Sequence, residues 1–257
     1  MPSSTDPSNA RDSSQVLELR QYALRPRSRD ALLSLFDRVF VDAQEDVGLR
    51  VIGQFRDLDD PDRFVWLRGF PDVRSRAERL AAFYGGPVWK ANCEAANATM
   101  IDSDDVLLLR PVDADSGFLL PRTRPAASAV DSSGGVVLAT IHLLRHPVDA
   151  SFLRFFQTRV SSLMAAAGAS PLASFQTEYA KNDFPKLPVR EGEHAFVWFA
   201  SFPSVEDLER HHVELRRSIS WTSSVEPELA RFCKCPRLEL RLAPTLRSLL
   251  RHVEPAG

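Results

Sequence analysis

The 257-residue sequence lacks several features that would narrow its function. It has no apolar run near the ~20 residues that a membrane helix needs, so we predict no membrane insertion. Its 32 Lys and Arg against 34 Asp and Glu give a net charge of −2, which argues against a nucleic-acid partner. Residues 1–14 are polar and lack the apolar core of a secretory signal. We therefore predict a disordered tail there and a cytoplasmic location.

Missing motifs remove further classes of protein. The sequence has no G-x-S-x-G, no P-loop and no G-x-G-x-x-G in a βαβ context, which argues against hydrolase triads, kinases and dinucleotide enzymes. Cys93, Cys233 and Cys235 are odd in number and form no C-x-x-C pair, so we expect free thiols. Histidines and carboxylates are not at helical metal spacing, and we predict neither a metal nor a cofactor.

What the sequence does contain is an internal repeat. Phe64-Val65-Trp66 followed by Phe70-Pro71 recurs 132 residues later as Phe196-Val197-Trp198 followed by Phe202-Pro203. Each half has the pattern of strand, helix, strand, strand, helix and strand, which is the ferredoxin-like βαββαβ unit. The second half carries about twelve extra residues within 176–194. This insertion is either a lid over a site or a plain surface excursion.

The third strand of each half is apolar on both faces, so both faces must be covered. Helices cover one face, and the sister sheet is the simplest cover for the other. We predict an α+β fold in which two tandem ferredoxin-like repeats form an intramolecular α+β barrel with a cavity between the halves. The predicted parts are a tail (1–14), a first repeat (15–112), a linker (113–135), a second repeat (136–245) and a C-terminal tail (246–257).

Three stretches of the first half resemble a known family. Leu17–Tyr22 followed by Pro26, Phe83–Lys90, and Ala96–Pro111 are similar to the corresponding stretches of NIPSNAP-domain proteins. The second half departs from this pattern, so we expect the two halves to have different roles and any site to be asymmetric. The resemblance implies a dimeric α+β-barrel fold. That superfamily includes cofactor-free monooxygenases, haem-binding enzymes, small cyclases and lyases, and binding modules, so it does not select a chemistry.

In the first half, Glu18, Arg20 and Tyr22 alternate on one strand and therefore point the same way. If they point into the barrel, Arg20 could bind a carboxylate or enolate bidentately. The alternative is a structural Glu–Arg pair beside a hydrogen-bonded tyrosine. Tyr84 and Trp89 flank a Gly-Gly-Pro turn, and they line either the barrel mouth or an ordinary helix end.

In the second half, His142 lies in an otherwise apolar strand and corresponds to Gln21 at an offset of 121. It is either a general base, an axial haem ligand or a core histidine with one hydrogen bond. On the second helix His212 aligns with the apolar Leu80 and is expected in the core, while His211 is expected in solvent.

These residues support three functions. The first is a small-molecule enzyme that acts on an apolar or aromatic substrate without a nucleotide cofactor, by proton transfer or cofactor-free oxygenation. The second is a non-catalytic ligand-binding or protein-interaction module, which predicts a filled barrel without convergent polar groups. The third is a haem protein with His142 or His212 as ligand. A homodimer is left open. The candidate catalytic residues are His142, Arg20, Tyr22 and His212, and the candidate substrate-binding residues are Glu18, Trp66, Tyr84, Trp89 and Trp198.

Overall fold

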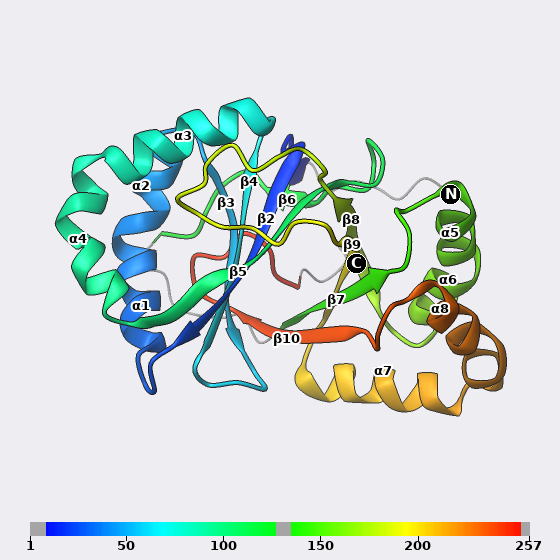
Figure 1. The fold of residues 1–257 in the computed structure, drawn as a ribbon. Helices are drawn as coiled ribbons and strands as arrows, with labels where there is room; N and C mark the ends of the chain where they lie inside the picture. Colours follow the sequence, from blue (N-terminus) through cyan, green and yellow to red (C-terminus); the bar gives the residue numbers. More distant parts are fainter. Residues whose placement is uncertain (1–8, 127–134, 253–257) are drawn as a thin grey trace.

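The computed structural model describes residues 9–126 and 135–252 and shows a closed eight-stranded barrel with helices on two sides (Figure 1). The helices of the first half lie on the left in this view, and those of the second half lie on the right and below. Within the described residues, no helix is both long and apolar enough to cross a membrane.

The first half has the predicted order of strands and helices, with one additional helix, α4, that we had not predicted. Gly48, with φ of 84°, ends its first helix in the left-handed region, and the Asp72 side chain begins α3 by accepting a hydrogen bond from the Ser75 amide at 2.7 Å. Its elements are β2 (Val16–Leu24), α1 (Arg29–Leu35), a π-helical turn (Phe36–Phe40), α2 (Val41–Asp46), β3 (Arg50–Asp57), β4 (Arg63–Phe70), α3 (Val73–Gly85), α4 (Pro87–Asn97) and β5 (Met100–Pro111).

The second half repeats this order, including the π-helical turn within its first helix. Asp149 and Ser204 begin α5 and α7 by accepting hydrogen bonds from backbone amides, as Asp72 does in the first half. Its elements are β7 (Val136–Leu144), α5 (Ala150–Phe155), a π-helical turn (Phe156–Val160), α6 (Ser161–Ala166), β8 (Ser170–Thr177), β9 (His194–Phe202), α7 (Val205–Arg217), a π-helical turn (Trp221–Val225), α8 (Glu226–Phe232) and β10 (Leu238–Pro244).

The strands close in the order β10-β3-β4-β2-β5-β8-β9-β7, and all neighbours are antiparallel. Each half contributes four adjacent strands. The halves join where Leu109 of β5 pairs with Thr177 of β8 and where Leu242 of β10 pairs with Asp57 of β3. The predicted α+β barrel is therefore confirmed.

The barrel interior is packed with apolar side chains, so the cavity that we predicted between the halves is replaced by a core. Leu17 and Leu19 of β2 and Val65 and Leu67 of β4 point inward and are fully or almost fully buried. Because most inward positions carry branched or aromatic residues and a few carry alanine, the side chains together fill the space. The second half contributes Val137, Ala139, Ile141, Phe175, Ala195, Val197, Phe199, Leu240 and Leu242 to this core.

Segments that we assigned to tails and linker take part in the fold. The predicted N-terminal tail contains β1 (Asn9–Arg11), which pairs with β6 (Leu119–Pro121) from the predicted linker. Phe118 of the linker and Leu249 of the predicted C-terminal tail belong to the barrel core. Disorder was predicted only for residues 1–14, and the pairing of β1 shows that this prediction is wrong for residues 9–11. The linker and the C-terminal tail are ordered where their apolar side chains complete the core. Residues 1–8, 127–134 and 253–257 lie outside the described residues.

Candidate functional site

Glu18, Arg20 and Tyr22 share one face of β2, as predicted, but that face meets the helices of the first repeat. The opposite face carries Leu17 and Leu19 into the barrel core. Alternation along a strand fixes only that the two sets point in opposite directions. The apolar set points into the barrel interior, so Glu18, Arg20 and Tyr22 do not line a pocket inside the barrel.

Glu18 is the centre of a buried ion cluster between the sheet and the helices. Its Oε2 accepts hydrogen bonds from Arg20 Nη1 at 2.8 Å and from Arg68 Nε at 2.7 Å, and its Oε1 accepts one from Arg76 Nε at 2.6 Å. All four side chains are fully buried. Burial alone would raise the pKa of Glu18, but Arg68, Arg20 and Arg76 hold it well below its ordinary value. Glu18 is therefore a fixed carboxylate that orients three guanidinium groups, and it is a poor proton acceptor.

The cluster has more positive than negative charge. Three guanidinium groups surround one carboxylate, and the Nη2 atoms of Arg68 and Arg76 are buried without a hydrogen-bond partner among the described residues. Buried donors in proteins are normally paired, so unpaired charged donors mark a place that suits a further acceptor. The arrangement therefore favours an anionic group near Arg68 and Arg76.

Two tyrosine hydroxyls extend the cluster toward the aromatic side chains of the helices. Arg20 Nε donates to Tyr22 Oη at 2.9 Å, and Arg68 Nη1 donates to Tyr84 Oη at 3.4 Å. Because a guanidinium can only donate, each hydroxyl accepts this bond and keeps its own proton for another partner. Burial raises the pKa of Tyr22, which keeps its proton in place.

Both hydroxyls line a small cavity between the sheet and the helices, with a volume of about 30 Å³. Trp66 lies in its wall with an indole N–H that has no hydrogen-bond partner in the described part of the chain, and the Arg68 guanidinium lies 4.9 Å from the Trp66 ring centroid. The predicted site residue Trp89 also lines it. The remaining lining residues are Leu32, Phe36, Phe40, Gln44, Phe83, Ala96 and Met100.

The insertion in the second repeat, residues 178–193, covers this site. Its two ends run along β5, because the Glu178 amide donates to Leu108 O at 2.9 Å and the Arg190 amide donates to Val106 O at 2.8 Å. In Figure 1 the loop crosses in front of β5 and β2 toward α3. A loop of the second repeat thus covers the site of the first repeat.

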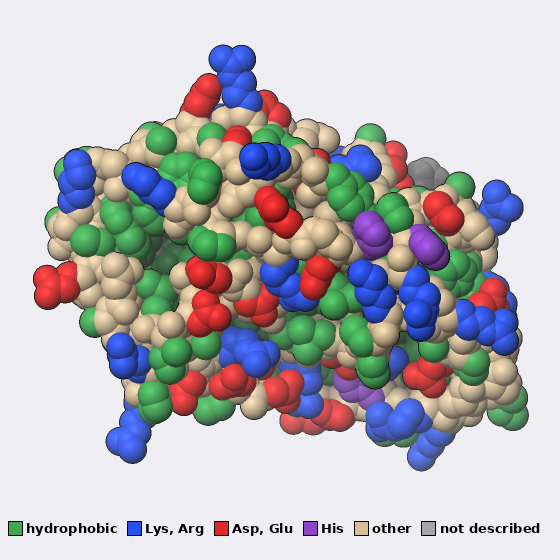
Figure 2. All heavy atoms as spheres, viewed as in Figure 1, with side chains coloured by type: hydrophobic (Ala, Val, Ile, Leu, Met, Phe, Trp, Pro, Cys, Tyr) green, Lys and Arg blue, Asp and Glu red, His purple; other side chains and the backbone are tan. Residues whose placement is uncertain are grey.

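The tip of the loop contacts the cluster directly. Arg76 Nη1 lies 2.9 Å from Asp183 Oδ1 and donates a hydrogen bond to it, and the Phe184 ring stacks on Tyr84 with centroids 6.1 Å apart. Basic and acidic side chains are interspersed over this face of the molecule (Figure 2), so surface charge does not single out the site. The lid, one of the two alternatives for this insertion, stays a prediction.

In the second repeat, His142 occupies the place of Tyr22, whereas we had predicted that it corresponds to Gln21. Tyr22 pairs with Phe64, and His142 pairs with Phe196, which is the repeat partner of Phe64. The offset between the first strands is therefore one residue smaller than the one we used. A shift of one residue moves a side chain to the other face of a sheet, so His142 faces the helices.

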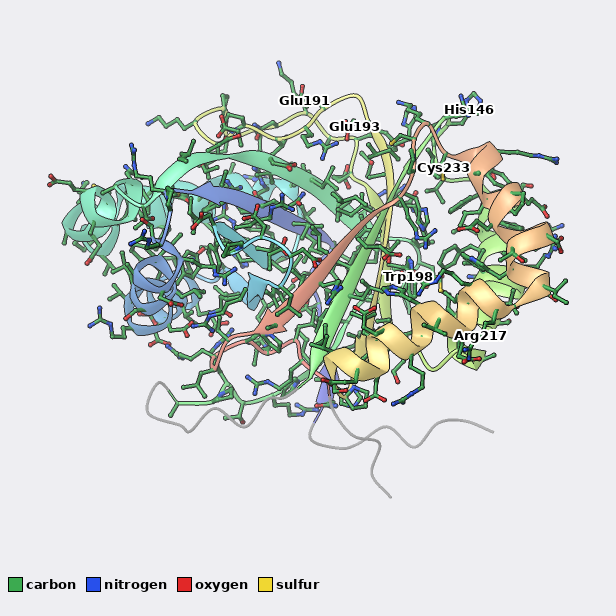
Figure 3. All side chains as sticks on the ribbon, turned by 90° about the horizontal axis from the view of Figure 1, so that it is seen from below. His146, Glu191, Glu193, Trp198, Arg217 and Cys233 are labelled. Carbon is green, nitrogen blue, oxygen red and sulfur yellow. The ribbon has the colours of Figure 1, made fainter. Side chains whose placement is uncertain are left out.

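His142 is almost fully buried, and its Nδ1 lies 3.8 Å from Cys233 Sγ. Burial lowers the pKa of His142 to about 3 and raises that of the Cys233 thiol, so both groups are neutral. They border an open cavity of about 620 Å³. Figure 3 shows Cys233 close to the end of α8, and Trp198 between the strands and the helices. His142 Nε2 has no hydrogen-bond partner among the residues that the structure describes, but it is covered, so these residues do not fit a haem without rearrangement.

The two histidines of α7 are exchanged relative to our prediction. His211 is buried, with Nδ1 3.1 Å from Ala167 O, whereas His212 is partly exposed and its Nε2 lies 3.3 Å from Glu239 Oε2. The buried stripe of α7 runs through Leu208, His211 and Leu215, and both this spacing and the one through residue 212 fit a helix. The alignment of the two repeats favoured the stripe through residue 212, which is not the buried one.

The predicted site residues therefore fall into two groups, each between the sheet and the helices of its own repeat. Glu18, Arg20, Tyr22, Trp66, Tyr84 and Trp89 belong to the first, and His142, Trp198 and His212 to the second. Sequence reasoning missed Arg68 and Arg76. Arg68 interrupts an apolar strand two residues after Trp66, and Arg76 shares a helical stripe with Leu80 and Phe83, so each was detectable as a charge at a core position.

The NIPSNAP family model matches residues 17–114. The first repeat is a NIPSNAP domain. No significant match was found among curated proteins. Three solved structures resemble the whole chain: a candidate monooxygenase from Fusobacterium nucleatum subsp. nucleatum (TM-score 0.53, 7% identity, 94% of this chain and 95% of that one), another from Lactobacillus acidophilus (0.51, 12%, 90% and 94%) and an anthrone oxidase-like protein (0.51, 10%, 91% and 92%). At these identities the likeness shows the fold alone.

All four residues of the ion cluster lie in the NIPSNAP domain, and the second repeat replaces each of them with an uncharged residue. Cross-strand pairing shows the equivalence, because Glu18 stands opposite Arg68 where Leu138 stands opposite Ala200. The aromatic pair Phe64 and Trp66 is kept as Phe196 and Trp198. The counterparts of Glu18, Arg20, Arg68 and Arg76 are Leu138, Thr140, Ala200 and Leu208.

Proposed function

We propose that the NIPSNAP domain binds a small aromatic molecule in an anionic form, as an enolate or phenolate, and promotes its oxygenation by dioxygen. The observation that carries this proposal is the pair of hydroxyls, Tyr22 and Tyr84, that accept from buried arginines and keep their own protons for the cavity. Structural neighbours named as candidate monooxygenases and as an anthrone oxidase-like protein support this class of reaction.

The proposed role of the site is to stabilise negative charge on oxygen. Each hydroxyl is polarised by the guanidinium that donates to it, so its remaining proton becomes a stronger donor to an oxyanion. The positive charge of Arg20 and Arg68 acts on the same anion from fully buried side chains, where solvent screens it little. Fixed donors of this kind, aimed at developing charge, are the largest single contribution to many enzymatic rates.

Proton removal from the substrate does not need Glu18, whose oxygens are held by three arginines. By binding the anion, the site instead lowers the pKa of the substrate, so an activated C–H or O–H can lose its proton to water. For an activated methylene, the carbanion adds dioxygen to form a C–O bond. The resulting peroxide, once protonated, loses water and leaves a carbonyl. His142 and His212 belong to the other repeat and have no part in this scheme.

The size of the cavity defines what must move. A cavity of about 30 Å³ holds roughly one water, whereas an apolar cavity that admits benzene measures about 150 Å³. An aromatic ring therefore enters only when Tyr84 or the covering loop is displaced. The stacked pair Tyr84 and Phe184 is the first contact to separate, because Phe184 is supplied by that loop.

The test is a comparison of Tyr22→Phe with Tyr179→Phe. Tyr179 is half exposed, bonds His194 Nδ1 at 2.9 Å and lies outside the proposed site, so its variant controls for loss of a hydroxyl. Oxygen uptake is measured with a panel of activated phenols and cyclic ketones, and binding by calorimetry. We expect Tyr22→Phe to lose about 100- to 1000-fold in turnover and Tyr179→Phe to keep it.

Equal rates in Tyr22→Phe and wild type would contradict the proposed role of the hydroxyl. Binding of the panel without oxygen uptake would instead favour the second candidate, a non-catalytic ligand-binding module. The filled barrel interior supports that alternative.

A further inference from the structure

Asp183 makes an unusual contact for a loop residue. It belongs to the second repeat, yet its carboxylate lies 2.9 Å from Nη1 of Arg76, a fully buried arginine of the NIPSNAP domain. Asn182 Oδ1 accepts from the same Nη1 at 3.0 Å. The side chain of Asp183 remains 28% exposed, so one face of this ion pair is open to solvent. The carboxylate thus reaches the positive cluster from outside.

Two features show that the cluster can take a carboxylate from another source. First, Glu18 and Asp183 together still leave three arginines with one excess positive charge. Second, Nη2 of Arg76 and Nη2 of Arg68 are buried and have no partner within residues 9–126 and 135–252, although Arg76 is already bonded to both anions. A guanidinium binds a carboxylate best through two parallel hydrogen bonds, and Asp183 uses one.

The neighbour of Asp183 connects this contact to the aromatic cavity. Phe184 stacks on Tyr84, whose hydroxyl accepts from Arg68 and lines the cavity. Loop residues 183 and 184 therefore place a carboxylate and an aromatic ring beside the positions where an aromatic acid would place its own.

We infer that Asp183 and Phe184 act as an internal mimic of the ligand, and that the ligand of the NIPSNAP domain is a small aromatic carboxylate which displaces Asp183 from Arg76. This inference rests on the proposed function and adds the carboxylate to it. The ring takes the place next to Tyr84, and the carboxylate pairs with the Arg76 Nη1 that Asp183 leaves and with the adjacent Nη2. Binding and loop release are then one event.

The test uses benzoate and its neutral analogue benzamide as probes, with affinities measured by calorimetry on the full chain. In Asp183→Asn the competing charge is gone, so we expect benzoate to bind at least about tenfold tighter than to wild type and benzamide to bind equally. Asp183→Ser serves as a second variant with the same expectation. The matched control is Asp105→Asn, which removes the ion pair between Asp105 of β5 and Arg190 of the loop, at 3.1 Å, and leaves Arg76 untouched.

The control variant should change the affinities for benzoate and benzamide by the same factor, because it only loosens the loop. Unchanged benzoate affinity in both Asp183 variants would overturn the inference. So would equal tightening of benzoate and benzamide, which would mean that Asp183 acts as a tether and not as a mimic. If no protein, including both Asp183 variants, binds either probe, the inference fails, whereas the proposed function is decided separately by the panel of phenols and cyclic ketones.

Discussion

Glu18→Gln tests whether the buried ion cluster is held by a single carboxylate. The substitution keeps the shape of the side chain and removes the only fully buried negative charge among three fully buried arginines. Removing one partner of a buried ion pair costs about 3–5 kcal/mol, because the other charge stays behind unpaired. With three guanidinium groups left, we expect the upper part of this range. For a chain of this size that corresponds to a loss of about 10–15 °C in Tm.

The same variant predicts a pH dependence with a definite sign. The pKa of Glu18 is lower in the folded than in the unfolded protein, so its contribution is present above the unfolded pKa of about 4.3 and is lost as the pH falls below it. The difference in unfolding free energy between wild type and Glu18→Gln should therefore be constant above pH 6. It should shrink by about 2 kcal/mol at pH 3.

Urea unfolding at a series of pH values, followed by fluorescence and circular dichroism, measures both effects. Glu78→Gln is the control, because Glu78 forms an exposed pair with Arg74 at 3.3 Å and should change stability by less than about 0.5 kcal/mol. A Glu18→Gln variant as stable as the control, or a stability difference that does not vary below pH 5, would refute this description of the cluster.

Two further predictions concern the core and the second repeat. Phe118→Ala should lower the free energy of unfolding in urea by about 3–5 kcal/mol, because the Phe118 ring centroid lies 5.0 Å from those of Phe175 and Phe199. Leu119→Ala, at the half-exposed position next to it, should lower the same free energy by under about 1 kcal/mol. Equal losses would show that the segment is not part of the core. His142 has a folded pKa of about 3, so the stability that it contributes is present above the unfolded pKa of about 6.5 and is lost as the pH falls. Between pH 8 and 5, wild type should lose about 2 kcal/mol more than His142→Phe, and parallel pH profiles would contradict the neutral, buried state of the ring.

The fold was predictable because the signals for it are local and occur twice. The recurrence of Phe64-Val65-Trp66 as Phe196-Val197-Trp198, together with apolar residues on both faces of these strands, requires two covered sheets. The direction of each face was not predictable from the same signals. Leu17 and Glu18 are adjacent, and alternation alone does not say which of them meets the sister sheet.

The site was only partly predictable because its members come from elements far apart in the sequence. Glu18, Arg20 and Tyr22 were found together because they lie on one strand. Arg76 joins them from a helix, and Asp183 joins from the other repeat, and no periodic pattern links either residue to β2. The one-residue error at His142 arose from assuming a constant offset, whereas the connection after each first strand differs in length.

The comparison between the repeats argues that the ion cluster is not required by the fold. The same layer between sheet and helices packs in the second repeat with Leu138, Thr140, Ala200 and Leu208, none of which is charged. Well-packed apolar replacements of buried ion clusters are often neutral or stabilising, whereas partial removal is not. The combined variant Glu18→Leu, Arg20→Thr, Arg68→Ala and Arg76→Leu gives the first repeat the residues of the second.

We expect this combined variant to unfold in urea at a midpoint close to that of wild type, far above Glu18→Gln, and to lose binding of the aromatic anion. Non-additivity of this size is characteristic of residues that form one network, and it is measured by comparing the single with the combined variant. If the combined variant were less stable than Glu18→Gln, the cluster would be a structural device of the NIPSNAP domain. If it were stable and still bound the anion, the arginines would have no part in recognition. Stability without binding is the outcome that assigns the three buried arginines to the ligand, because only then is their positive charge dispensable for folding and required for function.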